Sequence, residues 1–186
     1  MVTDNSKGAY EAVRYLIELG HHRILLLTTG TRISTVQGYL KGYKRALKEN
    51  NLLYDESLVR RCEETEAGEN RLFIGYNVVK EILQEKLDFT AIFATDDNFA
   101  AGAIKALKEK GLKIPEDISV IGFDDLPFSS FIDPPLTSVM QRKYQMGRKA
   151  AEILMRIVRK EVAHPQRILL EPELVIRQSC GRNDIG

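Results

Sequence analysis

Cysteine, histidine and long apolar runs are scarce in this sequence, and each shortage excludes a class of protein. The two cysteines, Cys62 and Cys180, lie far apart and match no metal-ligand spacing, so we expect two reduced thiols and no metal site. His21 and His22 lie between a helical and a strand pattern, which favours helix-end positions over metal ligation. No apolar run is long enough to span a bilayer, and residues 1–8 carry no signal-peptide pattern. We therefore expect a cytoplasmic protein without membrane contact.

An excess of one charge is also missing. The 27 basic and 26 acidic residues give a formal net charge of +1, which argues against a dedicated nucleic-acid surface, because such surfaces cluster basic residues. Three enzyme signatures are absent: the Walker phosphate loop, a G-x-G-x-x-G turn after a strand, and the G-x-S-x-G nucleophile elbow. A phosphate-accepting receiver domain would need paired acids after its first strand, where this chain has Thr28 and Thr29. We therefore expect no catalysis and no cofactor.

The apolar residues that are present follow two periodicities along the chain. Five segments repeat them at helical spacing, namely residues 9–17, 36–47, 78–83, 100–107 and 146–157. Residues 24–27 and 91–94 are apolar throughout, and residues 118–123 are mostly apolar, as expected of strands buried on both faces. Further short strands are indicated at residues 58–62, 136–141, 168–170 and 174–176. A chain of 186 residues is long enough to bury one good-sized core or two small ones.

The order of these segments predicts an α/β fold. Strands and helices alternate, which favours a doubly wound parallel sheet with helices on both faces, because parallel strands need crossover connections and a helix fills each gap. The pattern changes after Asp125, where residues 128–135 are predicted to form a loop. The polar tail, residues 179–186, is expected to be frayed.

Polar residues follow the buried strands, where an open parallel sheet binds its ligands. Asp96 and Asp97 follow one strand and Asp124 follows the next. Their carboxylates accept charge-assisted hydrogen bonds from the hydroxyl groups of sugars. An aspartate at such a junction also caps a helix, and this role is favoured for Asp97, while Asp96 stays open to either role. Asp124 is balanced between ligand contact and loop bracing, and Arg32 is expected to be solvated.

Six strings, spread in order along nearly the whole chain, carry a family resemblance. Residues 111–125 match G-L-x-I-P-x-D-I-S-V-I-G-F-D-D, and residues 90–102 match T-A-I-F-x-x-x-D-x-x-A-x-G. The other matching strings lie, in order, within residues 4–24, 42–47, 134–147 and 173–179. Together they resemble the C-terminal lobe of the lactose-repressor (LacI/GalR) family of bacterial transcription regulators.

The resemblance implies that residues 1–186 form one lobe of a periplasmic-binding-protein-like fold in a repressor-like regulator. In that family a small effector, usually a sugar or purine, binds between two lobes and changes lobe closure, dimer geometry and DNA affinity. The implied partners are a sugar-type effector, a second copy in a homodimer, and DNA through a helix-turn-helix headpiece that this chain lacks. The positions that match family effector contacts are Asp96, Asp124 and Gln141, with Glu64 or Thr65 after the second strand.

One departure from the family pattern concerns the effector contacts. Many members have an arginine three residues before Gly42, where this chain has Tyr39. Tyr39 either stacks on a differently bound sugar or belongs to a member regulated by a protein corepressor. It is otherwise only part of the helix stripe with Val36 and Tyr43, which its spacing favours.

A second departure is length. Residues 142–162 resemble a helix of the family's first lobe, most of which the chain lacks. The apolar stripe of this helix is therefore expected to have lost its usual partner and to favour self-association. A fragment of a periplasmic-type sugar-binding protein, which shares the fold, is the alternative to a regulator.

Overall fold

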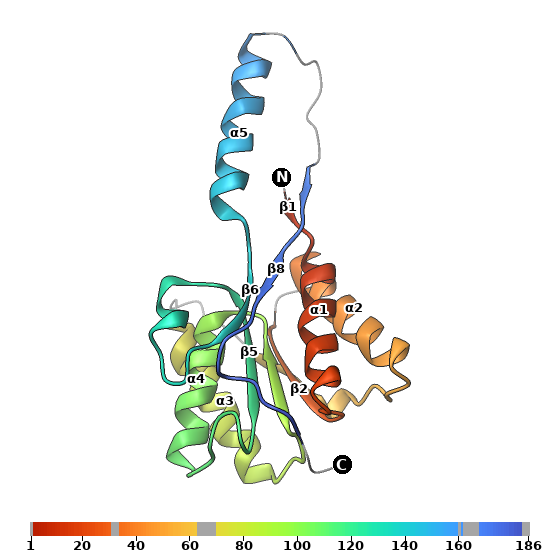
Figure 1. Ribbon diagram of the computed structural model, residues 1–186, viewed down its shortest axis with the longest axis vertical. Helices are drawn as coiled ribbons and strands as arrows, with labels where there is room; N and C mark the ends of the chain where they lie inside the picture. The colour runs from red at the N-terminus through yellow and green to blue at the C-terminus, as the bar shows by residue number, and fades with distance from the viewer. Residues whose placement is uncertain (1, 31–33, 63–69, 160, 162–167, 184–186) are drawn as a thin grey trace.

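The computed structural model describes residues 2–30, 34–62, 70–159, 161 and 168–183. Its centre is a six-stranded sheet in the order β3-β2-β4-β5-β6-β8 (Figure 1). Every neighbouring pair is parallel except β6 and β8, which are antiparallel. The strands are β2 (Ile24–Thr29), β3 (Val59–Cys62), β4 (Ala91–Ala94), β5 (Ser119–Asp124), β6 (Thr137–Met140) and β8 (Glu173–Val175). The predicted α/β fold is confirmed, with an antiparallel edge strand added.

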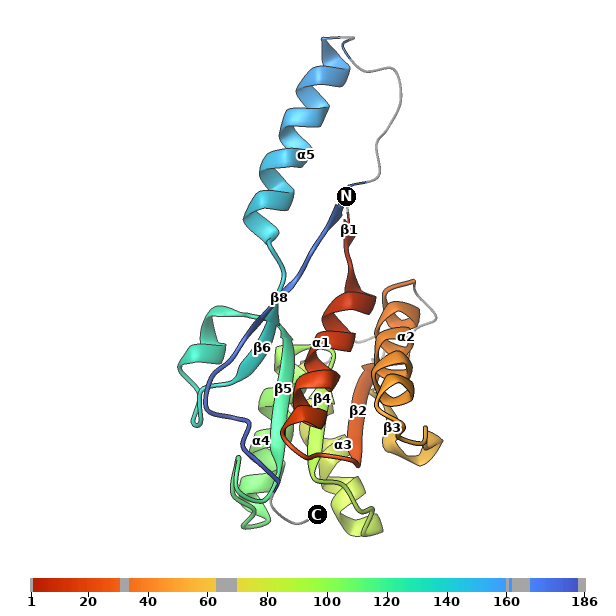
Figure 2. The same ribbon diagram turned by 45° about the vertical axis from the view of Figure 1, so that its right-hand side comes forward.

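Helices α1 to α4 cover the two faces of this sheet (Figure 2). Helices α1 (Asn5–Glu18) and α2 (Ser34–Glu49) lie on one face, and α3 (Arg71–Glu85) and α4 (Asp97–Glu109) lie on the other. Successive side chains of a strand point to opposite faces. Ile24 and Leu26 therefore join the core under α1 and α2, whereas Leu25 and Leu27 join the core under α3 and α4. The result is two buried apolar layers, one on each face of the sheet.

Two glycines allow the helices of each pair to approach closely. A Cβ atom on Gly42 of α2 would lie 2.2 Å from the carbonyl oxygen of Ser6 in α1. A Cβ atom on Gly102 of α4 would lie 2.1 Å from the carbonyl oxygen of Leu72 in α3. Both positions therefore need a residue without a side chain. Among the described residues, no helix combines the length and apolarity that crossing a membrane requires.

A smaller element joins the two ends of the chain. Strands β1 (Val2–Thr3) and β7 (Leu169–Leu170) form a two-stranded parallel ladder apart from the main sheet. Helix α5 (Lys143–Val158) stands away from the sheet on the side of this ladder (Figures 1 and 2). No side chain of α5 is buried, and Leu154 and Val158 are 60% and 68% exposed. Its apolar stripe is uncovered in the described part of the chain; its assignment to a missing lobe, and self-association, stay predictions.

The C-terminal tail is held against the sheet. The Ser179 hydroxyl donates to the carbonyl of Val120 at 2.6 Å and accepts from the Thr137 amide at 2.8 Å. The Asn183 amide donates to the carbonyl of Leu19 at 2.8 Å. The expectation of a frayed tail was therefore wrong for residues 179–183, because polar side chains there bond to backbone groups of distant elements. Residues 184–186 lie outside the described part.

Candidate functional site

The carboxyl ends of β2, β4 and β5 meet at one edge of the sheet, and the direction of winding reverses between β2 and β4. Open parallel sheets bind ligands at such a reversal. Asp96 follows β4, Asp124 ends β5, and Gln141 follows β6 at the same edge. Tyr39 reaches this edge from α2. The structure therefore brings four of the predicted site residues to one region.

Asp124 and Gln141 are in direct contact. The Gln141 Nε2 group donates to Asp124 Oδ1 at 2.5 Å, and its Oε1 accepts from Thr3 Oγ1 at 2.7 Å. The Lys143 ammonium lies 3.4 Å from the same Asp124 oxygen. Burial raises the pKa of the Asp124 carboxyl above its ordinary range, an effect that Lys143 opposes. A partly buried acceptor is thus tied, through one amide, to strand β1.

Asp96 is 4% exposed and caps α4, because its carboxylate accepts from the Asn98 amide at 2.7 Å. Its second oxygen accepts from Arg71 Nη1 at 2.5 Å. Arg71 is the first residue of α3; its side chain is 44% exposed and its guanidinium lies 5.9 Å from the ring centre of Phe99. The polar group that this strand end presents to solvent is therefore mainly the Arg71 guanidinium rather than the Asp96 carboxylate.

Tyr39 packs between the core and these charges. Its ring meets Phe123 edge to face, with ring centres 4.9 Å apart. Burial raises the pKa of the Tyr39 hydroxyl far above its ordinary value, Asp124 and Asp96 raise it further, and Arg71 lowers it. The hydroxyl therefore lies within the field of all three groups. Tyr39 also packs against the α1–α2 core, as its helical spacing indicated.

The helix cap that was expected at Asp97 is made by Asp96, whose role the sequence left open. Asp96 has the extended backbone of a capping residue, with φ −156° and ψ 136°, whereas Asp97 is already helical. Asp97 is fully buried, and its Oδ1 accepts from Ser138 Oγ at 2.6 Å. Its Oδ2 accepts from Ser129 Oγ and from the Leu126 amide, both at 2.7 Å. Burial raises the pKa of this carboxyl to about 6. Asp97 thus braces the loop after β5.

An open cavity of about 440 Å³ adjoins the site on the side of α5. Tyr39 and Gln141 line it, together with β1, the start of α1 and Met146 of α5. Its volume falls in the range of small-molecule pockets, roughly 300–1,000 Å³. The cavity therefore gives a ligand access to two of the four gathered residues.

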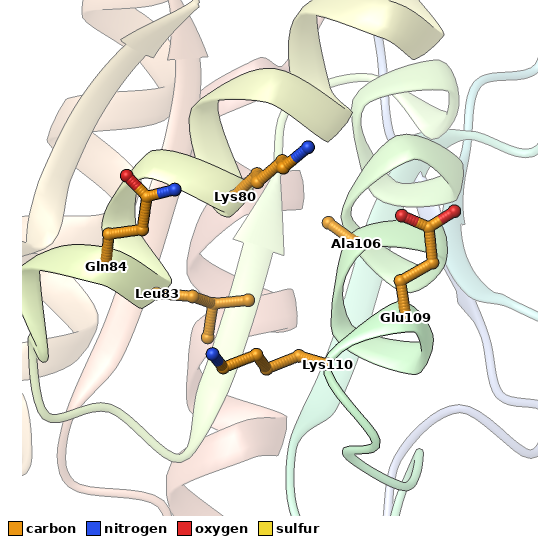
Figure 3. A pocket seen from close by; sticks show the side chains of 6 residues that line it. All are labelled: Lys80, Leu83, Gln84, Ala106, Glu109 and Lys110. Carbon is orange, nitrogen blue, oxygen red and sulfur yellow. The ribbon is translucent and has the colours of Figure 1, made fainter.

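A second, smaller cavity of about 190 Å³ lies between α3 and α4. Figure 3 shows Lys80 and Gln84 of α3 on one side and Glu109 and Lys110 at the end of α4 on the other. Both helices begin at the carboxyl edge of the sheet and end toward its amino edge. This cavity is therefore remote from the gathered residues, and it is smaller than a typical ligand pocket.

Two of the predicted site residues lie outside the described part of the chain, and Arg71 was not predicted from the sequence. Glu64, Thr65 and also Arg32 lie outside the described residues, so no contact is assigned to them. Arg71 was missed because the apolar pattern places the third helix only from residue 78. Asn70, whose side chain accepts from the Leu72 amide at 3.0 Å, was the available signal. Recognised as a helix cap, it would have placed Arg71 at the strand ends.

A family model described as a periplasmic binding protein-like domain matches residues 13–180. The chain belongs to this family. This chain is 38% identical over 177 residues to the HTH-type transcriptional regulator MalR of Clostridium butyricum. The match covers 95% of this chain and 51% of that protein. The chain is 40% identical over 184 residues to the HTH-type transcriptional repressor PurR of Haemophilus influenzae, covering 96% and 53%. The chain thus spans about half the length of these curated relatives.

Solved structures of LacI-family regulators share the fold of this domain. A complex of the transcriptional regulator CelR with cellobiose is 33% identical, with a TM-score of 0.85 over 95% of this chain and 52% of that chain. A LacI family regulator from Enterococcus faecium with bound ribose is 26% identical, with a TM-score of 0.85 over 98% and 65%. The resemblance to the effector-binding lobe of LacI-family regulators is therefore confirmed.

Proposed function

We propose that this domain is the ligand-sensing lobe of a DNA-binding transcription regulator and that its ligand is a small, hydroxyl-rich effector of the sugar class. The observation that carries the proposal is the gathering of Asp124, Gln141, Tyr39 and the Asp96–Arg71 pair at the carboxyl edge, where the winding reverses. The cellobiose and ribose bound to two regulators of this fold support the sugar class.

The gathered groups match the chemistry of a sugar. A sugar hydroxyl both donates and accepts, so Asp124 accepts from it, Arg71 donates to it, and Gln141 does either. Hydrogen bonds to charged groups contribute on the order of 1.5–3 kcal/mol each, which favours a ligand with several hydroxyls. The ring of Tyr39, held edge-on by Phe123, adds an apolar surface for the C–H face of the sugar.

The same contacts link the site to the rest of the regulator. The hydrogen bond from Thr3 to Gln141 connects the effector site to β1, which pairs with β7 beside α5. We propose that effector binding favours one arrangement of these connections over another, since a ligand shifts an equilibrium only by its differential affinity for the two states. We propose that the whole protein is a cytoplasmic homodimer with a DNA-binding headpiece. In it, the change in these connections would alter the dimer geometry and, through the headpiece, the affinity for DNA.

Thermal unfolding followed by circular dichroism tests the proposal. Cellobiose, ribose and a purine base are added at ten times their measured Kd, which stabilises the folded state by about 1.4 kcal/mol. For a domain of this size the midpoint is then expected to rise by roughly 3–6 °C with a bound sugar. Asp124→Asn is expected to abolish the shift. Asp133→Asn, whose side chain is 91% exposed, is the matched control and is expected to keep it.

The outcomes separate the candidates. A sugar-dependent shift that survives Asp124→Asn would place the ligand elsewhere and contradict the proposed site. No binding of any compound would reject a small effector for this lobe and favour regulation by a protein corepressor.

A further inference from the structure

The turn that carries Asp124 has an unfavourable backbone conformation. Asp124 and Asp125 have φ angles of +109° and +47°, in the region that favours glycine. Residues held in such conformations cost on the order of 1–3 kcal/mol each and persist only where surrounding contacts impose them. The direction of the Asp124 side chain therefore depends on whatever holds this turn.

Asp97 holds two consecutive amides of the turn. The Leu126 amide donates directly to Asp97 Oδ2 at 2.7 Å. The Asp125 amide donates to Ser138 Oγ at 3.1 Å, and Ser138 Oγ donates to Asp97 Oδ1 at 2.6 Å. A hydroxyl has one proton, so Ser138 gives it to the carboxylate and uses a lone pair for the amide. Both amides are thus fixed by one carboxylate, directly or through a serine.

The Asp97 carboxylate is tightly packed against strand β5. A Cβ atom on Gly122 of β5 would lie 2.2 Å from Asp97 Oδ1, so the glycine makes the space that the carboxylate fills. Asp97 is fully buried, and Ser129 supplies its third donor at 2.7 Å. Hydrogen bonds in such a low-dielectric interior are stronger, and breaking one leaves a costly unpaired group.

The far side of the turn is anchored independently. The Asp125 carboxylate lies 2.7 Å from Arg177 Nη2, and both side chains are less than one-fifth exposed. Of the two acidic residues in the turn, only Asp124 directs its carboxylate to Gln141 and Lys143. Two anchors therefore turn one side chain inward and present the other at the candidate site.

We infer that Asp97 is the positioning residue of the effector site: through Leu126, and through Ser138 to Asp125, it holds the strained turn that aims Asp124 at Gln141. The inference rests on the proposed function for its ligand, although the positioning itself is measurable without one.

Amide hydrogen exchange and NMR of the full chain test the positioning near neutral pH, comparing wild type with Asp97→Asn and with the control Asp133→Asn. Asparagine has the same shape as aspartate, but its NH2 group would face at least one of the three groups that donate hydrogen bonds to Asp97. We expect exchange at Asp125 and Leu126 to accelerate at least tenfold and the Gln141 side-chain amide resonance to move. The core amides of Leu26 and Phe93 report global unfolding and are expected to change less.

Ser138→Ala is the second variant, and it decides the question if Asp97→Asn does not fold. It removes only the relay, so exchange at Asp125 is expected to accelerate while Leu126, bonded directly to Asp97, stays protected. Unchanged exchange at both amides and an unmoved Gln141 resonance would overturn the inference, as would acceleration equal to that of the core amides.

A titration of the same variants with cellobiose and with ribose measures the effect of Asp97 on effector binding. We expect Asp97→Asn to weaken the Kd of the binding sugar at least tenfold and Asp133→Asn to leave it unchanged. Failure of wild type to bind either sugar counts against the proposed function, whereas the exchange data, which need no ligand, decide the positioning separately.

Discussion

The buried carboxyl of Asp97 makes the stability of this domain depend on pH in a defined direction. Asp97→Asn is the perturbation, since asparagine occupies the same volume and does not titrate. Burial raises the pKa of Asp97 from its ordinary 3.8 to about 6, and this effect exceeds the opposing hydrogen bonds from Ser138, Leu126 and Ser129. The folded state therefore binds the proton more tightly than the unfolded state does between these two values.

The magnitude follows from linkage. The stability associated with the raised pKa is fully present below pH 3.8 and is lost as the pH rises through about 6. At 1.36 kcal/mol per pKa unit, the difference corresponds to about 3 kcal/mol. The unfolding free energy of wild type minus that of Asp97→Asn is thus expected to fall by about 3 kcal/mol between about pH 3.5 and about pH 7.

Urea denaturation followed by far-ultraviolet circular dichroism at a series of pH values provides the assay, because the chain has no tryptophan for fluorescence. Subtracting the variant removes the contributions of the other titrating groups. Asp133→Asn, in which an exposed carboxylate is lost, controls for the change of one charge. A difference between wild type and Asp97→Asn that stays constant with pH, or rises with it, would refute the reasoning.

Two further predictions concern packing and the tail. Gly42→Ala is expected to lower the unfolding free energy by about 1–3 kcal/mol, because the new Cβ atom would clash with the Ser6 carbonyl oxygen. Gly147→Ala, whose Cβ atom would have nothing within 4 Å, is expected to raise the unfolding free energy by about 0.5–1 kcal/mol. Equal urea midpoints for the two variants would contradict this prediction. Ser179→Ala removes the partner of the Thr137 amide and one of the two donors to the Val120 carbonyl, which keeps the Cys180 thiol, and is expected to cost about 1–3 kcal/mol, with faster exchange at Thr137. An unchanged midpoint would show that the tail does not stabilise the sheet.

Local patterns were enough to predict the sheet and its helices. The runs at residues 24–27 and 91–94 are apolar at every position because both faces of β2 and β4 are covered. Strand β1 was missed because its two residues are set by pairing with residues 169–170, which no local pattern reveals. The frayed tail was predicted wrongly for a similar reason, since Ser179 bonds to strands that lie 42 to 59 residues earlier in the chain.

Part of the site could be predicted from the sequence. Strand ends and the family resemblance pointed to Asp96, Asp124, Gln141 and Tyr39, and the structure gathers them at one edge. The roles of the two neighbouring aspartates were not predictable, because the donors of Asp97 come from residues 126–138 and meet it only in the folded state. The roles of Glu64 and Thr65 stay predictions.

The most direct test of the central claim is chemical-shift mapping of the isotope-labelled chain during titration with cellobiose, ribose and a purine base. The account predicts that a sugar moves the resonances of Asp124, Gln141, Tyr39 and Arg71 together, in a saturable manner, while those of Lys80 and Glu109 at the smaller cavity stay in place. Saturable shifts centred on Lys80 and Glu109, or no shifts with any of the compounds, would contradict an effector site at the carboxyl edge of this sheet.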